Sequence, residues 1–175
     1  MRRECTVSSL MANLYAIPII ITITAFYLIL FKLFWNVNDL KSVLDYNLIL
    51  YLIVIAAGCF LHEIIHWLTF KTAGKINKAD LKFGFQYKTL TPYVHCHVPV
   101  TIRIYRLSLW MPFLILGGIL VVLSLLLNEF GLFLLSFLFC CLSGGDLLIL
   151  FMLMNTDKRS LIIDHSSKCG CIVFH

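Results

Sequence analysis

Long apolar runs dominate the chain, and four of them have the length of a helix that crosses a membrane. They cover residues 14–35, 47–70, 107–127 and 130–154. A helix needs about 20 apolar residues to cross the hydrocarbon core of a bilayer. The first run follows Arg2 and Arg3, as in a signal peptide, but it is too long for one and no small-residue cleavage site follows it. The pattern therefore predicts four transmembrane helices.

Between the second and third runs the pattern changes to alternation of apolar and polar residues, which is typical of strands. One alternating segment covers residues 81–88 and another covers residues 94–105. Two such segments around a short break that contains a proline predict a β-hairpin at about residues 80–105. Because Pro99 has no N–H to donate, we expect the second strand to lie at an edge or to carry a bulge.

The tail, residues 155–175, contains two short apolar runs at 161–163 and 172–174 that are candidates for further strands. The chain has no internal repeat and no low-complexity linker. The sequence thus predicts a mainly α membrane protein that forms a single membrane-embedded domain over residues 1–175. Its four transmembrane helices carry a small cytosolic β-hairpin between helices 2 and 3.

Composition supports the membrane assignment and excludes several other classes. Of the 175 residues, 61% are hydrophobic and 13% are charged, whereas soluble domains are about half apolar and a quarter charged. A soluble domain of this size could not bury so much apolar surface. The same values exclude a disordered chain, a collagen-like fibre and a secreted disulfide scaffold. The net charge is +5, but no basic face with interleaved aromatic residues suggests a nucleic-acid partner.

The distribution of the basic residues predicts the orientation. With four spans, the two termini and the middle loop share one side, which holds twelve of the 14 Lys and Arg residues. Only Lys32 and Lys41 lie on the other side. The positive-inside rule therefore places both termini in the cytoplasm of a multi-pass cell-membrane protein. No cysteine then lies in an oxidising compartment, so we expect no disulfide. Cys169-x-Cys171, with His165 nearby, is a minor candidate for metal binding.

The second span contains the motif His62-Glu63-Ile64-Ile65-His66. The i, i+4 spacing places both imidazoles on one helix face, within reach of one metal ion. Glu63 is positioned to reach a metal-bound water without being a ligand. Ionisable residues inside a span are costly without partners, so a functional site is the default interpretation. The alternative is a hydrogen-bonded polar patch that joins helices.

Zinc requires a third protein ligand and leaves one position for water. The metzincin pattern would place glycine and histidine where the chain has Thr69 and Thr72. The pattern in which a downstream glutamate is the third ligand is also absent, because the only acid between the motif and Glu129 is Asp80, in the loop.

Asp146 in the fourth span is the better candidate for the third ligand. It lies about eight residues from the inner end of its span, and His62 and His66 lie four to eight residues from the inner end of theirs. At 1.5 Å per residue these depths match. The small residues 143–145 would let another helix approach closely. Asp146 as an interhelical hydrogen-bonder and His95 with His97 as rival ligands remain alternatives.

These motifs resemble those of a known family. The quoted residues are the motif at 62–66, Gly145-Asp146, Cys96-x-x-Pro99 and Met111-Pro112. From about residue 50 onward the chain resembles the putative zincin peptidase family of small bacterial membrane proteins. More distantly it is similar to the site-2 protease class of intramembrane metalloproteases, whose third ligand is also an Asp in a late span. In that class Asp precedes Gly, whereas here Gly145 precedes Asp146. The resemblance implies a zinc peptidase.

We therefore expect a membrane-embedded endopeptidase that binds one Zn²⁺ through His62, His66 and Asp146. Glu63 acts as general base on a zinc-bound water, and cleavage occurs in or near the cytosolic half of the bilayer. The substrate is a membrane protein or peptide, held by β-addition to the strand at 94–105; alternatively, the hairpin only covers the cytosolic face.

A different function class also fits the motif, namely a non-proteolytic metal-binding membrane protein such as a zinc carrier or a degenerate peptidase scaffold. A protein that only binds a metal has no need for Glu63, so the presence of this residue favours a catalysed reaction. A bis-histidine haem is disfavoured because His62 and His66 share one helix face. The sequence leaves open the substrate and the oligomeric state.

Overall fold

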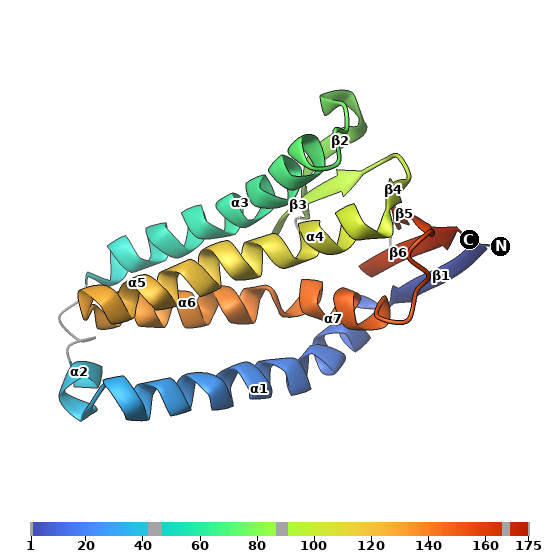
Figure 1. Ribbon diagram of the computed structural model, residues 1–175. Coiled ribbons are helices and arrows are strands. Elements are labelled where there is room, and N and C mark those ends of the chain that lie inside the picture. The colour runs from blue at the N-terminus through green and yellow to red at the C-terminus, as the bar shows by residue number, and fades with distance from the viewer. Residues whose placement is uncertain (1, 42–46, 87–90, 166–168, 175) are drawn as a thin grey trace.

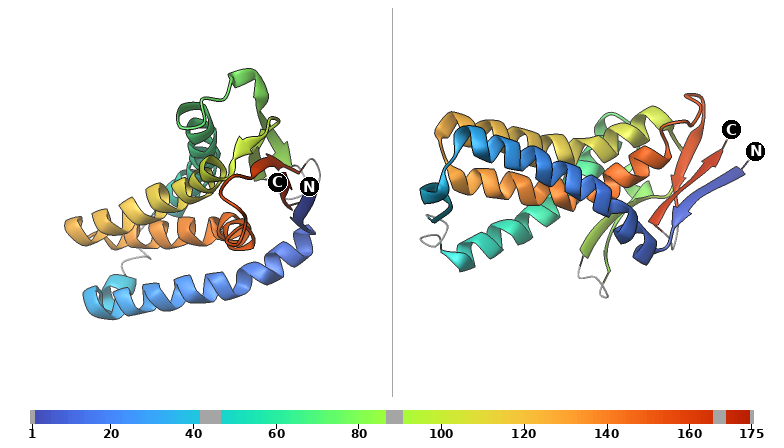
Figure 2. Two further views of the ribbon diagram at one scale, coloured as in Figure 1. Left: turned by 45° about the vertical axis from the view of Figure 1, so that its right-hand side comes forward. Right: turned by 90° about the horizontal axis from the view of Figure 1, so that it is seen from below.

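Long helices run side by side, and small sheets gather at one end of them, beside both termini (Figure 1). The computed structural model describes residues 2–41, 47–86, 91–165 and 169–174. Figure 2 shows from two further directions that the strands lie at one end of the helices. The polar, strand-forming part of the chain is thus separated from its apolar, helical part.

The first two apolar runs form the long helices α1 (Ser9–Phe34) and α3 (Leu48–Thr72). Each begins with a side-chain cap: the Oγ of Ser8 accepts from the Met11 N–H, and the Oδ1 of Asn47 accepts from the Leu50 N–H. A short helix, α2 (Val37–Lys41), follows α1 at the end far from the sheets. Only 11% of the most apolar window of α1, and likewise of α3, is buried inside the protein. Both helices therefore present wide apolar surfaces outward.

The third run forms a continuous helical segment of α4 (Ile102–Pro112), the π-helical η3 (Phe113–Ile119) and α5 (Leu120–Leu127). The fourth run is bent by 41° between α6 (Phe130–Leu142) and α7 (Gly144–Met152). The described residues contain three helices that are long and apolar enough to cross a membrane, or four if the bent pair forms one span. The protein is therefore a mainly helical membrane protein, as predicted.

The middle segment differs from the predicted hairpin. The hairpin consists of β2 (Leu81–Gln86) and β3 (Thr91–Cys96), and its turn, residues 87–90, lies outside the described residues. The strand predicted over 94–105 is interrupted after Cys96 and resumes only at Val100–Thr101, which pair with the tail rather than with the hairpin. The third helix begins at Ile102 rather than at residue 107. The alternation at 102–105 also fits a helix, because Ile102, Tyr105 and Leu109 are buried at helical spacing.

The other sheet joins segments from the start, the middle and the end of the chain. Its strand order is β1-β6-β5-β4, and all three pairings are antiparallel. The strands are β1 (Arg2–Val7), β4 (Val100–Thr101), β5 (Leu161–Asp164) and β6 (Cys169–Phe174). The tail strands were predicted, whereas β1 was not. The sheet holds both termini and the segment between α3 and α4 at the same end of the helices.

Buried side chains attach this sheet to the helices. Ile102 at the start of α4 and Leu153 after α7 are fully buried with Ile162 and Val173 of the sheet. At the level of α6, Gly58 of α3 lies against the ring of Phe139, and a Cβ at this glycine would collide with that ring. On the other side of α6, the Tyr27 hydroxyl of α1 donates to the Ser136 Oγ over 3.0 Å. These contacts fix the positions of α3, α4 and α7, which carry the polar residues described next.

Candidate metal centre

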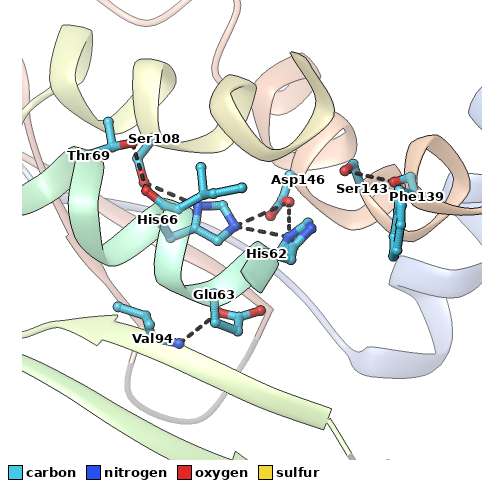
Figure 3. Close-up of polar contacts among 10 residues, drawn as sticks. His62, Glu63, His66, Thr69, Val94, Ser108, Phe139, Ser143 and Asp146 are labelled. Carbon is cyan, nitrogen blue, oxygen red and sulfur yellow. Dashed lines mark hydrogen bonds and ion pairs between the residues drawn. The ribbon is translucent and has the colours of Figure 1, made fainter. Parts of the chain in front are cut away.

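Two histidines from α3 and an aspartate from α7 meet inside the helices. The Nε2 atoms of His62 and His66 lie 3.1 Å apart. The Oδ2 atom of Asp146 lies 2.9 Å from the Nε2 of His62 and 3.4 Å from the Nε2 of His66. Figure 3 shows both rings pointing from α3 toward the carboxylate. The residues from the second and fourth apolar runs that were expected at one depth are thus in contact.

The chemistry and spacing of this trio fit a metal ion. Zinc binds imidazole nitrogen and carboxylate oxygen at about 2.0–2.2 Å in a tetrahedral arrangement, so two of its ligand atoms lie about 3.3 Å apart. The three distances here, 2.9, 3.1 and 3.4 Å, are close to that value. Both Nε2 atoms lie next to the same carboxylate oxygen, the Oδ2 of Asp146, so the three atoms are close enough to share one ion. The residues present therefore fit a zinc site.

Asp146 occupies the first turn of α7, directly after the bend between α6 and α7. The bend places the start of a new helix inside the protein, where the helix dipole favours a negative side chain. The expectation that residues 143–145 allow close helix approach is not met at the glycines. A Cβ at Gly145 would meet nothing within 4 Å, and one at Gly144 would make only ordinary contacts with α1. Close approach occurs instead at Gly58.

Glu63 points to the other side of the site, toward the hairpin (Figure 3). Its Oε2 accepts a hydrogen bond of 2.9 Å from the Val94 N–H of β3. One ligand atom each from His62, Glu63 and His66 lie within 4.8 Å of one another. Both acids thus lie beside the histidines, but Asp146 makes the shorter contacts and Glu63 is held by the strand.

Ser108 of α4 is a further polar neighbour that the sequence analysis did not identify. Its side chain is fully buried, and its Oγ lies 3.2 Å from the Nδ1 of His66. When the Nε2 of His66 binds a metal, its Nδ1 carries the proton and donates to an acceptor such as this hydroxyl. A small polar residue on the buried face of an apolar helix was the available signal.

The edge of β3 that faces away from β2 lies over the site. Val94 pairs with Phe83 and Cys96 pairs with Leu81, so both belong to the same set of alternate positions. Their N–H groups both donate outside the hairpin: Val94 to Glu63, and Cys96 to the Oδ2 of Asp164 over 2.8 Å. Each of these outward N–H groups is therefore paired with a carboxylate.

Asp164, at the end of β5, is the second residue that the sequence analysis missed. It lies outside the apolar helices, and its Oδ1 accepts a hydrogen bond of 2.7 Å from the Tyr105 hydroxyl of α4. Burial raises the pKa of Asp164, although its hydrogen bonds with Cys96 and Tyr105 oppose that shift. The carboxylate joins β3, β5 and α4 in one place.

A cavity of about 260 Å³ connects the metal centre with Asp164. Its walls include Glu63, His66, Val94, Tyr105, Asp146 and Asp164. The cavity is large enough to hold a short segment of peptide and lies between the helices and the β3 edge.

His95 and His97 were rival candidates for metal binding. Their rings contact each other, with 4.3 Å between centroids, and His95 lines the cavity. Burial lowers the pKa of His95. Cys169 and Cys171 were the minor candidates in the tail. Cys171 is buried, and the side chain of Cys169 lies outside the described part of the structure.

Comparison with known proteins identifies the family. The family model described as "Putative zincin peptidase" matches residues 55–161, which run from α3 to the start of β5 and include the whole metal centre. No curated protein and no solved structure matches the chain. The family description implies a metallopeptidase with zinc as its metal, in agreement with the His62, Glu63 and His66 group. Since the match covers more than half of the chain, the protein belongs to the putative zincin peptidase family.

Proposed function

We propose that the protein is a zinc-dependent, membrane-embedded endopeptidase that cleaves peptide bonds in or near the cytosolic half of the bilayer. The observation that carries this proposal is the convergence of His62, His66 and Asp146 with a second carboxylate, Glu63, beside them. A metal-binding protein without hydrolytic activity has no need for Glu63 next to its ligands.

The proposed topology has four spans, with α6 and α7 together forming the fourth. The four-stranded sheet supports it, because β1 precedes α1, β4 lies between α3 and α4, and β5 and β6 follow α7. The chain thus returns to the same end after α3 and again after α7. Because twelve of the 14 basic residues belong to this end, we place both termini and the sheets in the cytoplasm. All 175 residues then form one domain.

The residues take the following roles. His62, His66 and Asp146 would hold the metal, and Ser108 orients His66. Zinc held there would supply Lewis-acid chemistry that activates the attacking water. Glu63 takes a proton from the attacking water as its oxygen bonds to the scissile carbonyl carbon, and passes that proton to the leaving amine as the C–N bond breaks.

The proposed substrate is a membrane protein or peptide in extended form, because a helix hides its carbonyl groups in internal hydrogen bonds. The β3 edge lies beside Glu63 and borders the cavity. A peptide added to this edge as a further strand would lie next to the metal centre. Because β3 ends at Cys96, the strand proposed to bind the substrate is Thr91–Cys96 rather than residues 94–105.

Metal analysis combined with a protease assay tests the proposal. Purified protein in detergent is assayed for zinc content and for cleavage of fluorescein-labelled casein. Glu63→Gln should keep one zinc per chain and lose cleavage by at least about 100-fold, as expected for loss of a general base. Asp146→Ala should lose both. Glu129→Gln, at an exposed acid between α5 and α6, is the control and should change neither. Bound zinc without any cleavage by the wild type would favour a zinc carrier instead.

A further inference from the structure

The hydrogen bond between Glu63 and the β3 edge has a consequence for substrate binding. In an antiparallel strand, alternate residues direct their N–H and C=O groups to the same edge. Pro92, Val94 and Cys96 share the edge that faces the cavity. Pro92 has no N–H, so this edge of β3 has two donors, and both already bind carboxylates.

The two carboxylates are held differently. Asp164 also accepts the hydroxyl of Tyr105, and it connects β5 with β3 and α4. Asp164 therefore keeps the Cys96 N–H occupied as a fixed part of the fold. Glu63 contacts the strand at Val94, and its side chain extends from α3 toward β3. Val94 is thus the position at which an added strand can gain a backbone donor.

We propose that the Val94 N–H is the substrate anchor of the enzyme and that Glu63 occupies it until a peptide strand binds. A carbonyl of the extended substrate takes the place of the Glu63 carboxylate on this N–H. The displaced carboxylate is then free to turn toward the reacting peptide bond. The base is released only when backbone is present at the β3 edge, so the enzyme selects extended peptide chains and rejects ligands too short to reach Val94. This inference rests on the proposed peptide hydrolysis.

The competition between Glu63 and the substrate gives a binding test that needs no turnover. Four zinc-loaded variants are compared in detergent: Glu63→Gln and Glu63→Ala, each with and without Val94→Pro. Glutamine still accepts from the Val94 N–H, whereas alanine does not. The probe is fluorescein-labelled casein, an extended polypeptide, and the readout is fluorescence anisotropy.

Glu63→Ala should bind casein about five- to ten-fold more tightly than Glu63→Gln, which corresponds to removal of one competing hydrogen bond. Val94→Pro should weaken binding to both and abolish the difference between them. Proline is tolerated here because the Val94 N–H does not serve the ladder with β2. Val94→Ala keeps the N–H and should leave the difference intact.

Equal affinity of Glu63→Gln and Glu63→Ala for casein would overturn the anchor, and this comparison does not depend on the folding of the proline variants. Absence of casein binding in all four variants would overturn it as well. Casein cleavage by the wild type, abolished in Glu63→Gln, tests the proposed hydrolysis separately. Cleavage together with equal affinities would therefore reject the anchor and leave the protease standing.

Discussion

The Oγ of Ser108 lies 3.2 Å from the Nδ1 of His66, and it reaches this histidine from a different helix. A partner on the second ring nitrogen fixes the tautomer and the orientation of a metal-binding histidine, and its loss typically lowers metal affinity 10- to 100-fold. We expect such a loss for Ser108→Ala, measured by competition with a zinc chelator. Ser124→Ala is a matched control, since Ser124 is equally buried but its Oγ donates to the Val121 carbonyl in α5. Equal affinities in both variants would contradict the role of Ser108.

Arg106 connects α4 to the end of the helix that carries Asp146. Its Nη2 donates to the carbonyl groups of Leu153, Met154 and Thr156. Hydrogen bonds with a charged donor contribute about 1.5–3 kcal/mol, and we expect Arg106→Gln to lower the free energy of unfolding by about that amount. Zinc affinity should fall with it, because these hydrogen bonds help to hold α7 and Asp146 against α4. The measurements are denaturant unfolding in detergent and chelator competition.

Arg103 provides the control for this variant, because it is an exposed arginine one helical turn earlier. Arg103→Gln should leave both quantities within error of the wild type. A similar loss in the two variants would mean that net charge, rather than the carbonyl contacts, produces the effect.

The contact between Gly58 and Phe139 predicts that α3 and α6 cannot tolerate a larger side chain there. A Cβ at position 58 collides with the buried Phe139 ring. Overpacking of this kind costs about 1–3 kcal/mol, so Gly58→Ala should lower the free energy of unfolding by that amount. In the double variant with Phe139→Ala, the added methyl group meets no ring, and the two effects should not be additive. Strict additivity would show that the two residues do not interact.

The thiol of Cys171 should resist alkylation in the folded protein. The residue is fully buried in β6, opposite Cys5 of β1, and burial raises its pKa to about 12. Alkylation requires the thiolate, which is scarce at pH 8 for such a group. Mass spectrometry after N-ethylmaleimide treatment should find Cys171 unmodified in mild detergent and fully modified in dodecyl sulfate. Rapid modification in mild detergent would contradict the pairing of the two terminal strands.

The parts of the site that could be predicted from the sequence depend on spacing along one helix and on depth in the membrane. Helical geometry places His62 and His66 together whatever surrounds them. Counting residues from the inner ends of two spans was enough to select Asp146, which lies 2.9 Å from His62. Ser108 and Asp164 were missed, because each reaches the site through the packing of a separate element and neither has a fixed spacing from the histidines.

The strand prediction failed where one pattern fits two structures. Alternation of Ile102 and Ile104 with Thr101 and Arg103 describes a strand, yet burial of Ile102 and Tyr105 also follows a helix. Tertiary packing decided in favour of α4, whose first residue is fully buried between the sheet and Leu153. The strand β1 was missed because its pairing partner, β6, is more than 160 residues away.

The pairing of β1 with β6 also sets an order of events during synthesis. The strand β1 leaves the ribosome before α1, and β6 follows only after α1 to α7 have been made. Asp164, which holds the Cys96 end of the β3 edge, is likewise made after the fourth apolar run. A partly synthesised chain therefore contains the two histidines of α3 without the finished wall that faces them. On the proposed function, the wall of the site that faces the histidines would be complete only after the tail has been translated.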